Sequence, residues 1–154
     1  MAKAPISPEK KFIARHALAL FGGKPKVQEY LHDDIDLSID ILSVVDSPEQ
    51  GTTAYSTLGL FETILGSGDK ELPTGVELCG AMPPDVEHWG NILAGASFAL
   101  MRTKQVVIPG SVLEGYVAEY YPHTTVPHLY LTAPFFWNDG HFQELTLDTG
   151  RTVN

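Results

Sequence analysis

Three histidines in the last third of the chain are the first candidates for chemistry. His123, His128 and His141 lie five and thirteen residues apart, in a region rich in aromatic residues. Zinc sites usually combine cysteine and histidine at short spacing, and the chain has neither an HExxH nor a CxxC pattern. We therefore expect no metal and no cofactor. A small-molecule or enzymatic pocket near these histidines is kept as an alternative.

The residues needed for covalent catalysis do not occur in a recognisable pattern. A catalytic serine or cysteine needs a base beside it, and no G-x-S-x-G motif is present because Pro109-Gly110-Ser111 lacks the second glycine. The loop Gly66-Ser67-Gly68 lacks the Gly-Lys-Ser/Thr that ends a phosphate-binding loop. Cys79, the one cysteine, lies in an apolar-flanked run and is interpreted as a small buried side chain. The sequence thus predicts no catalytic residues, and we expect a protein that is not an enzyme.

Four aspartates form an acidic cluster in the first third of the chain: Asp33, Asp34, Asp36 and Asp40. A calcium loop of the helix-loop-helix kind needs a central glycine, which this stretch lacks. Apolar and polar residues alternate from Ile35 to Ile41, and such alternation predicts a half-buried strand. We expect its polar face to be wet and acidic.

The overall charge also restricts the partners. The chain of 154 residues carries 19 acidic and 10 basic side chains, a formal net charge of −9. Nucleic acids and anionic membranes attract positive charge, so we expect neither as a partner, whereas a basic protein is compatible. No apolar run approaches the roughly 18 residues of a membrane span, and no apolar region follows the charged N-terminus, so no secretory signal is expected. With a single cysteine, we expect a cytoplasmic location.

Local signals predict the elements that position these residues. Ser7-Pro8-Glu9 is typical of a helix start and Gly22-Gly23 of a helix end. A strand is expected over Lys24–His32, paired with the acidic strand in a hairpin. Apolar residues at helical spacing predict a second helix over Val86–Lys104, with Asp85 as its N-cap. Further strands are expected over residues 52–60, 75–80 and 142–148.

The stretch Val106–Trp137 contains most of the later aromatic residues. We expect a short strand over residues 106–108 and a second strand over His128–Ala133. The second strand should be buried on both faces, because its residues belong to an apolar run rich in strand-forming residues, in which a proline ends the strand. Packing in the core is the interpretation for Phe135 and Trp137. Exposed tyrosines such as Tyr120 and Tyr121 would instead anchor a protein partner, since they combine apolar area with a polar tip.

An ordered set of short motifs resembles the Suppressor of fused domain family, and within it the short bacterial members. The set runs through nearly the whole chain and comprises Phe21-Gly22-Gly23-x-Pro25, Asp40-Ile41-Leu42, Tyr55-Ser56-Thr57-Leu58-Gly59-Leu60, Val76-Glu77-Leu78, Asn91-Ile92-Leu93, Pro109-Gly110, Tyr120-Tyr121-Pro122, His128-Leu129 and Pro134-Phe135-Phe136-Trp137. The resemblance implies an α/β (α+β) sandwich, with a mixed, largely antiparallel sheet and flanking helices. It also implies a binding protein without enzymatic chemistry.

Short bacterial members of the family resemble antitoxin or immunity proteins, so the expected partner is a cognate toxin. The candidate contact residues are the acidic cluster and the two tyrosines: Asp33, Asp34, Asp36, Asp40, Tyr120 and Tyr121. We expect one domain over residues 1–154. Family members continue beyond the position of Asn154, so the chain is either a short member or a truncated one. The oligomeric state is left open, and an oligomeric scaffold module is a further alternative.

Overall fold

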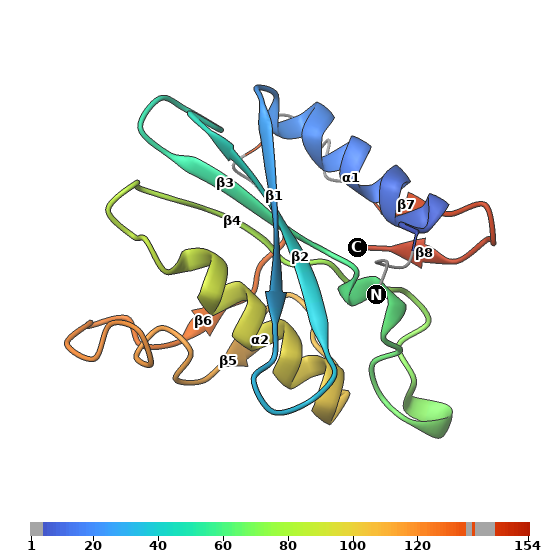
Figure 1. The fold of residues 1–154 in the computed structure, drawn as a ribbon. Helices are drawn as coiled ribbons and strands as arrows, with labels where there is room; N and C mark the ends of the chain where they lie inside the picture. The colour runs from blue at the N-terminus through green and yellow to red at the C-terminus, as the bar shows by residue number, and fades with distance from the viewer. Residues whose placement is uncertain (1–4, 135–136, 138–143) are drawn as a thin grey trace.

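A four-stranded antiparallel sheet forms the centre of the computed structural model, which describes residues 5–134, 137 and 144–154. Its strands are β1 (Pro25–Leu31), β2 (Ser38–Val45), β3 (Thr53–Leu58) and β4 (Cys79–Met82), hydrogen-bonded to one another in that order. Sequential strands are therefore spatial neighbours, as Figure 1 shows. The predicted hairpin of the first two strands is confirmed.

The first helix, α1 (Pro8–Phe21), begins and ends where the sequence predicts. The Ser7 hydroxyl accepts a hydrogen bond from the Lys10 N–H at 3.2 Å and caps the first turn. Gly22 adopts a positive φ of 70°, a conformation that glycine reaches at little steric cost, and this ends the helix. The helix buries one stripe, which includes Ile13 and Ala17, against the sheet.

The central strand β2 is covered on both faces. Ile39 and Ile41 belong to the core cluster formed with the second helix, α2 (Trp89–Thr103), whereas Leu42 and Val44 belong to the cluster formed with α1. Because alternate side chains of a strand point to opposite faces, the two helices cover opposite faces of the sheet. The predicted half-buried strand with one wet face is therefore wrong. The strand starts only at Ser38, and the preceding residues form a loop.

The second helix starts three residues later than predicted. His88 occupies the N-cap position of α2 without a capping hydrogen bond from its side chain, so the prediction of Asp85 as N-cap is wrong. Arg102 lies in the last turn, and Lys104 ends the helix with a φ of 54°. A broad apolar face of α2 is buried against the sheet, which confirms the predicted helical periodicity.

The strand predicted over His128–Ala133 is much shorter and does not lie in the central sheet. A two-residue strand, β6 (Leu129–Tyr130), pairs with β5 (Val112–Leu113) in a separate two-stranded sheet. Leu129 is buried, but Tyr130 is 68% exposed, so burial on both faces is wrong. Prolines 127 and 134 bracket the segment and have no N–H with which to extend the pairing. The predicted strand over residues 106–108 does not form.

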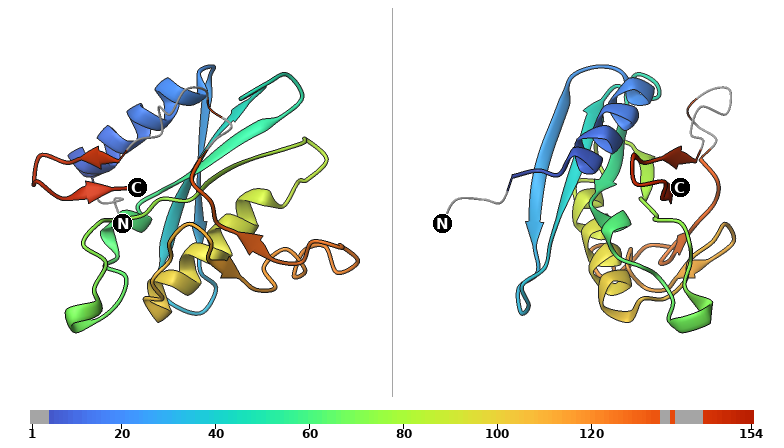
Figure 2. Two further views of the ribbon diagram at one scale, coloured as in Figure 1. Left: turned by 180° about the vertical axis from the view of Figure 1, so that it is seen from behind. Right: turned by 90° about the vertical axis from the view of Figure 1, so that its right-hand side faces the viewer.

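Two small sheets complete the layers, as seen from two sides in Figure 2. Leu113 and Leu129 bring β5–β6 into the core beside α2. The hairpin of β7 (Leu145–Thr146) and β8 (Thr152–Val153) contributes to the cluster around α1. Trp137 is buried against Phe21, with ring centroids 5.0 Å apart, which confirms its core role. Phe135 and most of the predicted strand over 142–148 lie outside the described residues.

The remaining elements are two short 3-10 helices, η1 (Leu60–Glu62) and η2 (Gly68–Lys70). Of the segment 75–80 that was predicted as one strand, only Cys79 and Gly80 join the central sheet. The first residues pair instead with the end of the chain, through a parallel bridge between Gly75 and Val153. This α+β arrangement confirms the predicted fold class. No helix in the described part of the chain has the length and apolar character to cross a membrane.

Candidate functional site

Three of the four clustered aspartates lie in the loop that joins β1 to β2. Asp33, Asp34 and Asp36 are exposed. The loop is closed by a hydrogen bond from the His32 N–H to the Leu37 carbonyl at 2.9 Å, and the Asp34 N–H donates to Nδ1 of His32 at 3.1 Å. These bonds hold three carboxylates close together on a tight, solvent-exposed tip.

The fourth aspartate, Asp40, does not share this surface. It lies within β2, is only 6% exposed, and forms an ion pair with Lys10 of α1 at 2.8 Å. The prediction that Asp40 stands on a wet acidic face is wrong, because α1 covers that side of the sheet. The carboxylate instead fixes α1 to the strand.

The two tyrosines of the sequence prediction lie beside the start of α2. The ring of Tyr120 stacks on His88 with centroids 5.3 Å apart, and the Tyr121 ring lies 5.9 Å from the same imidazole. The Tyr121 hydroxyl accepts a hydrogen bond from the His88 backbone N–H at 3.1 Å. Tyr120 is 37% exposed and Tyr121 is half-buried. Both tyrosines are therefore held in defined positions, with Tyr120 available at the surface.

A second pair of tyrosines links this cluster to the sheet. Burial raises the pKa of Tyr30 in β1, and the nearby Tyr55 and Tyr120 hydroxyls raise it further. Burial also raises the pKa of Tyr55 in β3, with a further contribution from Tyr121. Tyr30 is the second-last residue of β1, which the acidic loop follows. The tyrosine cluster therefore lies beside the start of α2, whereas the acidic loop lies farther along the same helix, where His32 contacts Phe98 with ring centroids 5.3 Å apart.

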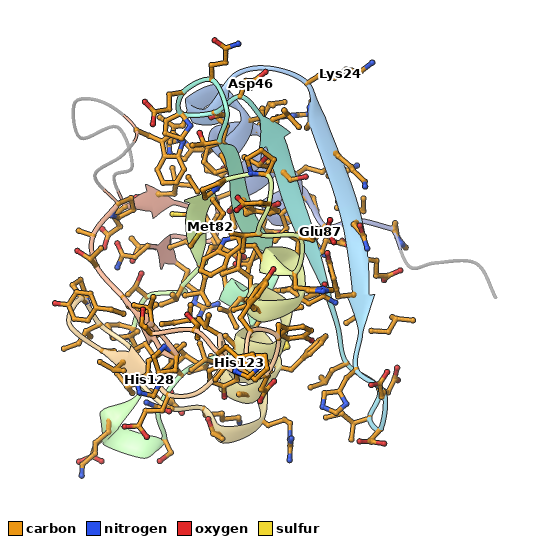
Figure 3. The ribbon with its side chains drawn as sticks, turned by 90° about the vertical axis from the view of Figure 1, so that its left-hand side faces the viewer. Lys24, Asp46, Met82, Glu87, His123 and His128 are labelled. Atoms are coloured by element: carbon orange, nitrogen blue, oxygen red, sulfur yellow. The ribbon has the colours of Figure 1, made fainter. Side chains whose placement is uncertain are left out.

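A groove of about 780 Å³ opens beside these tyrosines. One wall comes from the connection between β4 and α2, with Met82, Asp85 and Trp89, and the other comes from residues 117–130. Figure 3 looks onto this side of the molecule, with Met82 and Glu87 above His123 and His128. The groove residues are mostly apolar or aromatic, a composition typical of binding sites.

Two of the three predicted histidines share this groove. His123 and His128 both line it, whereas His141 lies outside the described residues. Nδ1 of His128 accepts a hydrogen bond from the Gly115 N–H at 2.9 Å, which orients the ring. Across the described residues, no three histidine, cysteine or acidic side chains are grouped as a metal site requires. The groove can therefore bind through apolar contacts and single polar groups.

Glu77 is a half-buried ionisable residue with an enclosed carboxyl group, which the sequence interpretation missed. Its carboxylate accepts hydrogen bonds from the Thr57 hydroxyl, from the Gly59 N–H at 2.7 Å and from the Phe61 N–H at 3.3 Å. Burial nevertheless raises the pKa of Glu77 to about 7, because enclosure favours the neutral acid more strongly than these donors favour the charged form. The signal in the sequence is a lone acid inside the apolar run Val76-Glu77-Leu78.

Cys79 follows two residues later and faces the same small cavity, of about 50 Å³. Burial raises the pKa of its thiol to about 12, so the reactive thiolate is suppressed at neutral pH. The residue as a whole is half-buried and packs against the cluster around α1, so the predicted burial of Cys79 is confirmed only in part.

Comparison with known proteins assigns the family. Residues 36–154 match the model of the Suppressor of fused protein (SUFU) family. The chain belongs to this family. This Suppressor of fused member is also 35% identical over 134 residues to Immunity protein YqcF of Bacillus subtilis (strain 168), an alignment that covers 87% of this chain and 70% of the relative. No solved structure matches the chain.

The family match confirms the resemblance seen in the sequence motifs. Both names, Suppressor of fused and immunity protein, point to a non-catalytic role with a protein partner. The match begins at Asp36 and includes the groove, whereas Asp33 and Asp34 precede it. The groove therefore lies in the part of this Suppressor of fused member that carries the family pattern.

Proposed function

We propose that this chain is an immunity protein that neutralises a toxin by binding it directly. The observation that carries the proposal is the 35% identity, over 134 residues, to a relative named as an immunity protein. The chain would act as a stoichiometric binder that occludes the toxin and has no chemistry of its own. We also propose that the protein acts in the cytoplasm of a bacterial cell, the location expected from the single cysteine.

The charge distribution supports a basic partner. The net charge of −9 gives the molecule a negative field at neutral pH, and such fields speed the approach of an oppositely charged partner. Asp33, Asp34 and Asp36 concentrate part of this charge on one exposed loop. Tyr120 and Tyr121, beside the start of α2, would add apolar contact area. We propose these five residues as contacts, with Asp40 holding α1 in place.

Growth rescue tests the proposal. The chain is co-expressed in a bacterial host with each toxin encoded beside its gene, and growth is compared with that of cells holding the toxin alone. Rescue of growth, together with a one-to-one complex in size-exclusion chromatography, is the expected result. Failure to rescue growth against every neighbouring toxin, with no complex detected, would remove the proposal.

Charge-neutral variants test the acidic loop separately. The triple change Asp33→Asn, Asp34→Asn and Asp36→Asn should slow association by roughly tenfold at low salt and have little effect at high salt. The matched control changes the same amount of charge at exposed residues elsewhere, with Glu49→Gln, Asp69→Asn and Asp148→Asn. Equal effects of the two triple variants would show that only net charge matters.

A second candidate function is the binding of a small molecule in the groove. The observation in its favour is that His123 and His128 share one cavity of about 780 Å³. A screen of metabolites by thermal shift would test it. A stabilising ligand should lose its effect when both histidines are changed to alanine. If no compound stabilises the protein, the small-molecule candidate fails and the immunity proposal is the one that stands.

A further inference from the structure

We infer that the groove beside α2 is the docking site for a basic, apolar segment of the partner, an inference that rests on the proposed function. For this purpose the groove surface is defined as the groove together with the outer face of β5–β6. Leu113 and Leu129 are cross-strand partners and point into the core, whereas Val112 and Tyr130 are the next pair and point outward. Directly opposed residues share a face, so this small sheet presents an apolar outer surface.

Three large apolar side chains of the groove surface are exposed. Tyr130 is 68% exposed, Val126 is 69% exposed and Val112 is 44% exposed. Tyr130 and Val126 also line the groove, so the exposed surface and the groove are continuous. Connected apolar surface of this kind, rimmed by polar groups, marks interaction sites on folded proteins.

The charges around the groove favour a positively charged partner segment. No lysine or arginine occurs between Glu71 and Met101 or between Gln105 and Gly150, the two stretches from which both walls are built. Asp85 lines the groove, and Glu87 and Glu119 are exposed residues that adjoin lining residues in sequence without lining the groove themselves. A cationic segment therefore meets the Asp85 carboxylate and no competing lysine or arginine in these walls.

The aromatic groups of the groove favour arginine over lysine as the cation. The stacked pair of His88 and Tyr120 lies beside the groove, and a planar guanidinium stacks on aromatic faces while it bonds to a carboxylate. Aliphatic side chains on the same segment would cover Val126 and Tyr130. A second copy of this chain fits poorly as occupant, because each copy carries a net charge of −9.

Trp89 offers a reporter inside the groove. It is 7% exposed, and its indole N–H has no hydrogen-bond partner among the described residues. The chain has two tryptophans, and the other, Trp137, lies in the cluster around α1. In a ¹⁵N-labelled protein the two indole signals can be assigned with Trp89→Phe, and the Trp137 signal serves as an internal control.

The first experiment uses defined peptides and does not require a known toxin. The probe is the blocked hexapeptide Gly-Arg-Leu-Arg-Leu-Gly, and its control has both arginines replaced by neutral citrulline. Titration with the arginine peptide should shift the Trp89 indole signal and leave that of Trp137 in place, with at least fivefold weaker binding of the citrulline peptide. No shift with either peptide, or equal shifts of both tryptophans, would overturn the inference.

Variants at exposed positions locate the binding. Asp85→Asn combined with Tyr130→Ala should weaken binding of the arginine peptide by about tenfold. The control, Asp69→Asn combined with Val45→Ala, likewise removes one carboxylate charge and shortens one exposed apolar side chain, but outside the groove, and should bind as the unchanged protein does. Equal binding by both double variants would overturn the inference. Circular dichroism confirms that each variant is folded.

The second experiment uses any toxin that the chain neutralises. The groove variant, Asp85→Asn with Tyr130→Ala, should no longer protect cells in the growth assay, whereas the control variant, Asp69→Asn with Val45→Ala, should still protect them. If both variants protect equally, with affinities within twofold of the unchanged protein, the immunity function stands and the groove inference fails. If no toxin is neutralised, the peptide titration still decides the groove inference, because a localised Trp89 shift supports it and its absence refutes it.

Discussion

Replacement of Glu77 by glutamine should change how the stability of the protein depends on pH. The carboxyl is enclosed, and burial raises its pKa from the ordinary 4.5 to about 7. Between these two values the folded protein keeps a proton that the unfolded chain has released. The contribution of the protonated Glu77 carboxyl to the free energy of unfolding is therefore fully present below about pH 4.5, and it is lost as the pH rises through about 7. Glu77 should therefore contribute less to the stability of the protein at neutral pH than at about pH 4.5.

The size of the effect follows from the two pKa values. A rise of this extent corresponds to about 3 kcal/mol of unfolding free energy. Glu77 as a whole residue keeps partial exposure, and solvent screening reduces such terms. We therefore expect a loss of about 2 kcal/mol from pH 5 to pH 8 that is specific to this residue.

Glutamine reproduces the neutral acid at this position. Its side-chain oxygen can accept from the Gly59 and Phe61 N–H groups, which both donate to Oε1 of Glu77. Its amide can donate to the Thr57 hydroxyl oxygen, which also accepts from the Leu78 N–H at 2.8 Å. The variant should match the unchanged protein near pH 5 and be more stable by about 2 kcal/mol at pH 8.

Urea unfolding followed by circular dichroism at pH 5, 6, 7 and 8 measures the difference. Burial lowers the pKa of His16, which adds an opposite pH dependence, but this contribution is common to both proteins and cancels in their difference. Glu71→Gln is the matched control at an exposed glutamate and should leave the profile unchanged. Parallel pH profiles for the unchanged protein and Glu77→Gln, or a variant less stable at pH 8, would refute the reasoning.

Two further predictions concern the attachment of the helices to the sheet. Lys10→Met should destabilise the protein by about 2 kcal/mol, because the buried Asp40 carboxylate loses its charged donor. In a double-mutant cycle measured by urea unfolding, Lys10→Met combined with Asp40→Asn should cost less than the sum of the two single changes. If the effects of the two single changes simply add, the ion pair does not contribute to stability. Gly90→Ala should cost about 1–3 kcal/mol, since the added Cβ would lie 2.3 Å from the Tyr30 hydroxyl oxygen. Gly95→Ala in the same helix has its nearest neighbour at 3.9 Å and should stabilise by up to about 1 kcal/mol; thermal melts that rank the two variants in the opposite order would contradict this packing.

Local signals predicted the ends of the first helix and the existence of the second. Ser7 and Gly22 act through hydrogen bonds and backbone angles within a few residues. The start and end of α1 can therefore be predicted from the sequence alone. The apolar period over residues 89–103 likewise predicted α2. The family motifs are also a property of order and spacing along the chain, and the match over residues 36–154 confirmed them.

Tertiary structure decided which polar residues remain at the surface. Alternation from Ile35 to Ile41 indicated one wet face, but a strand covered by helices on both sides buries both sets of side chains. Asp40 is therefore paired with Lys10 from a helix about thirty residues earlier, a long-range contact that no local pattern encodes. The opposite error concerns Tyr130, where the apolar run predicts a central strand, but among the described residues its strand pairs with the short β5 alone.

The groove and the pKa of Glu77 depend entirely on residues distant in sequence. Asp85 and Tyr130 meet across the groove only because α2 and β6 pack on the same side of the sheet. Glu77 meets Thr57 and Gly59 because the chain returns beside β3. The sequence by itself determined the ends of the first helix, the family and the acidic charge, since these depend on local signals, on the order of short motifs or on total composition. The exposure and neighbours of each charge were decided by long-range packing, because burial is a property of the assembled layers.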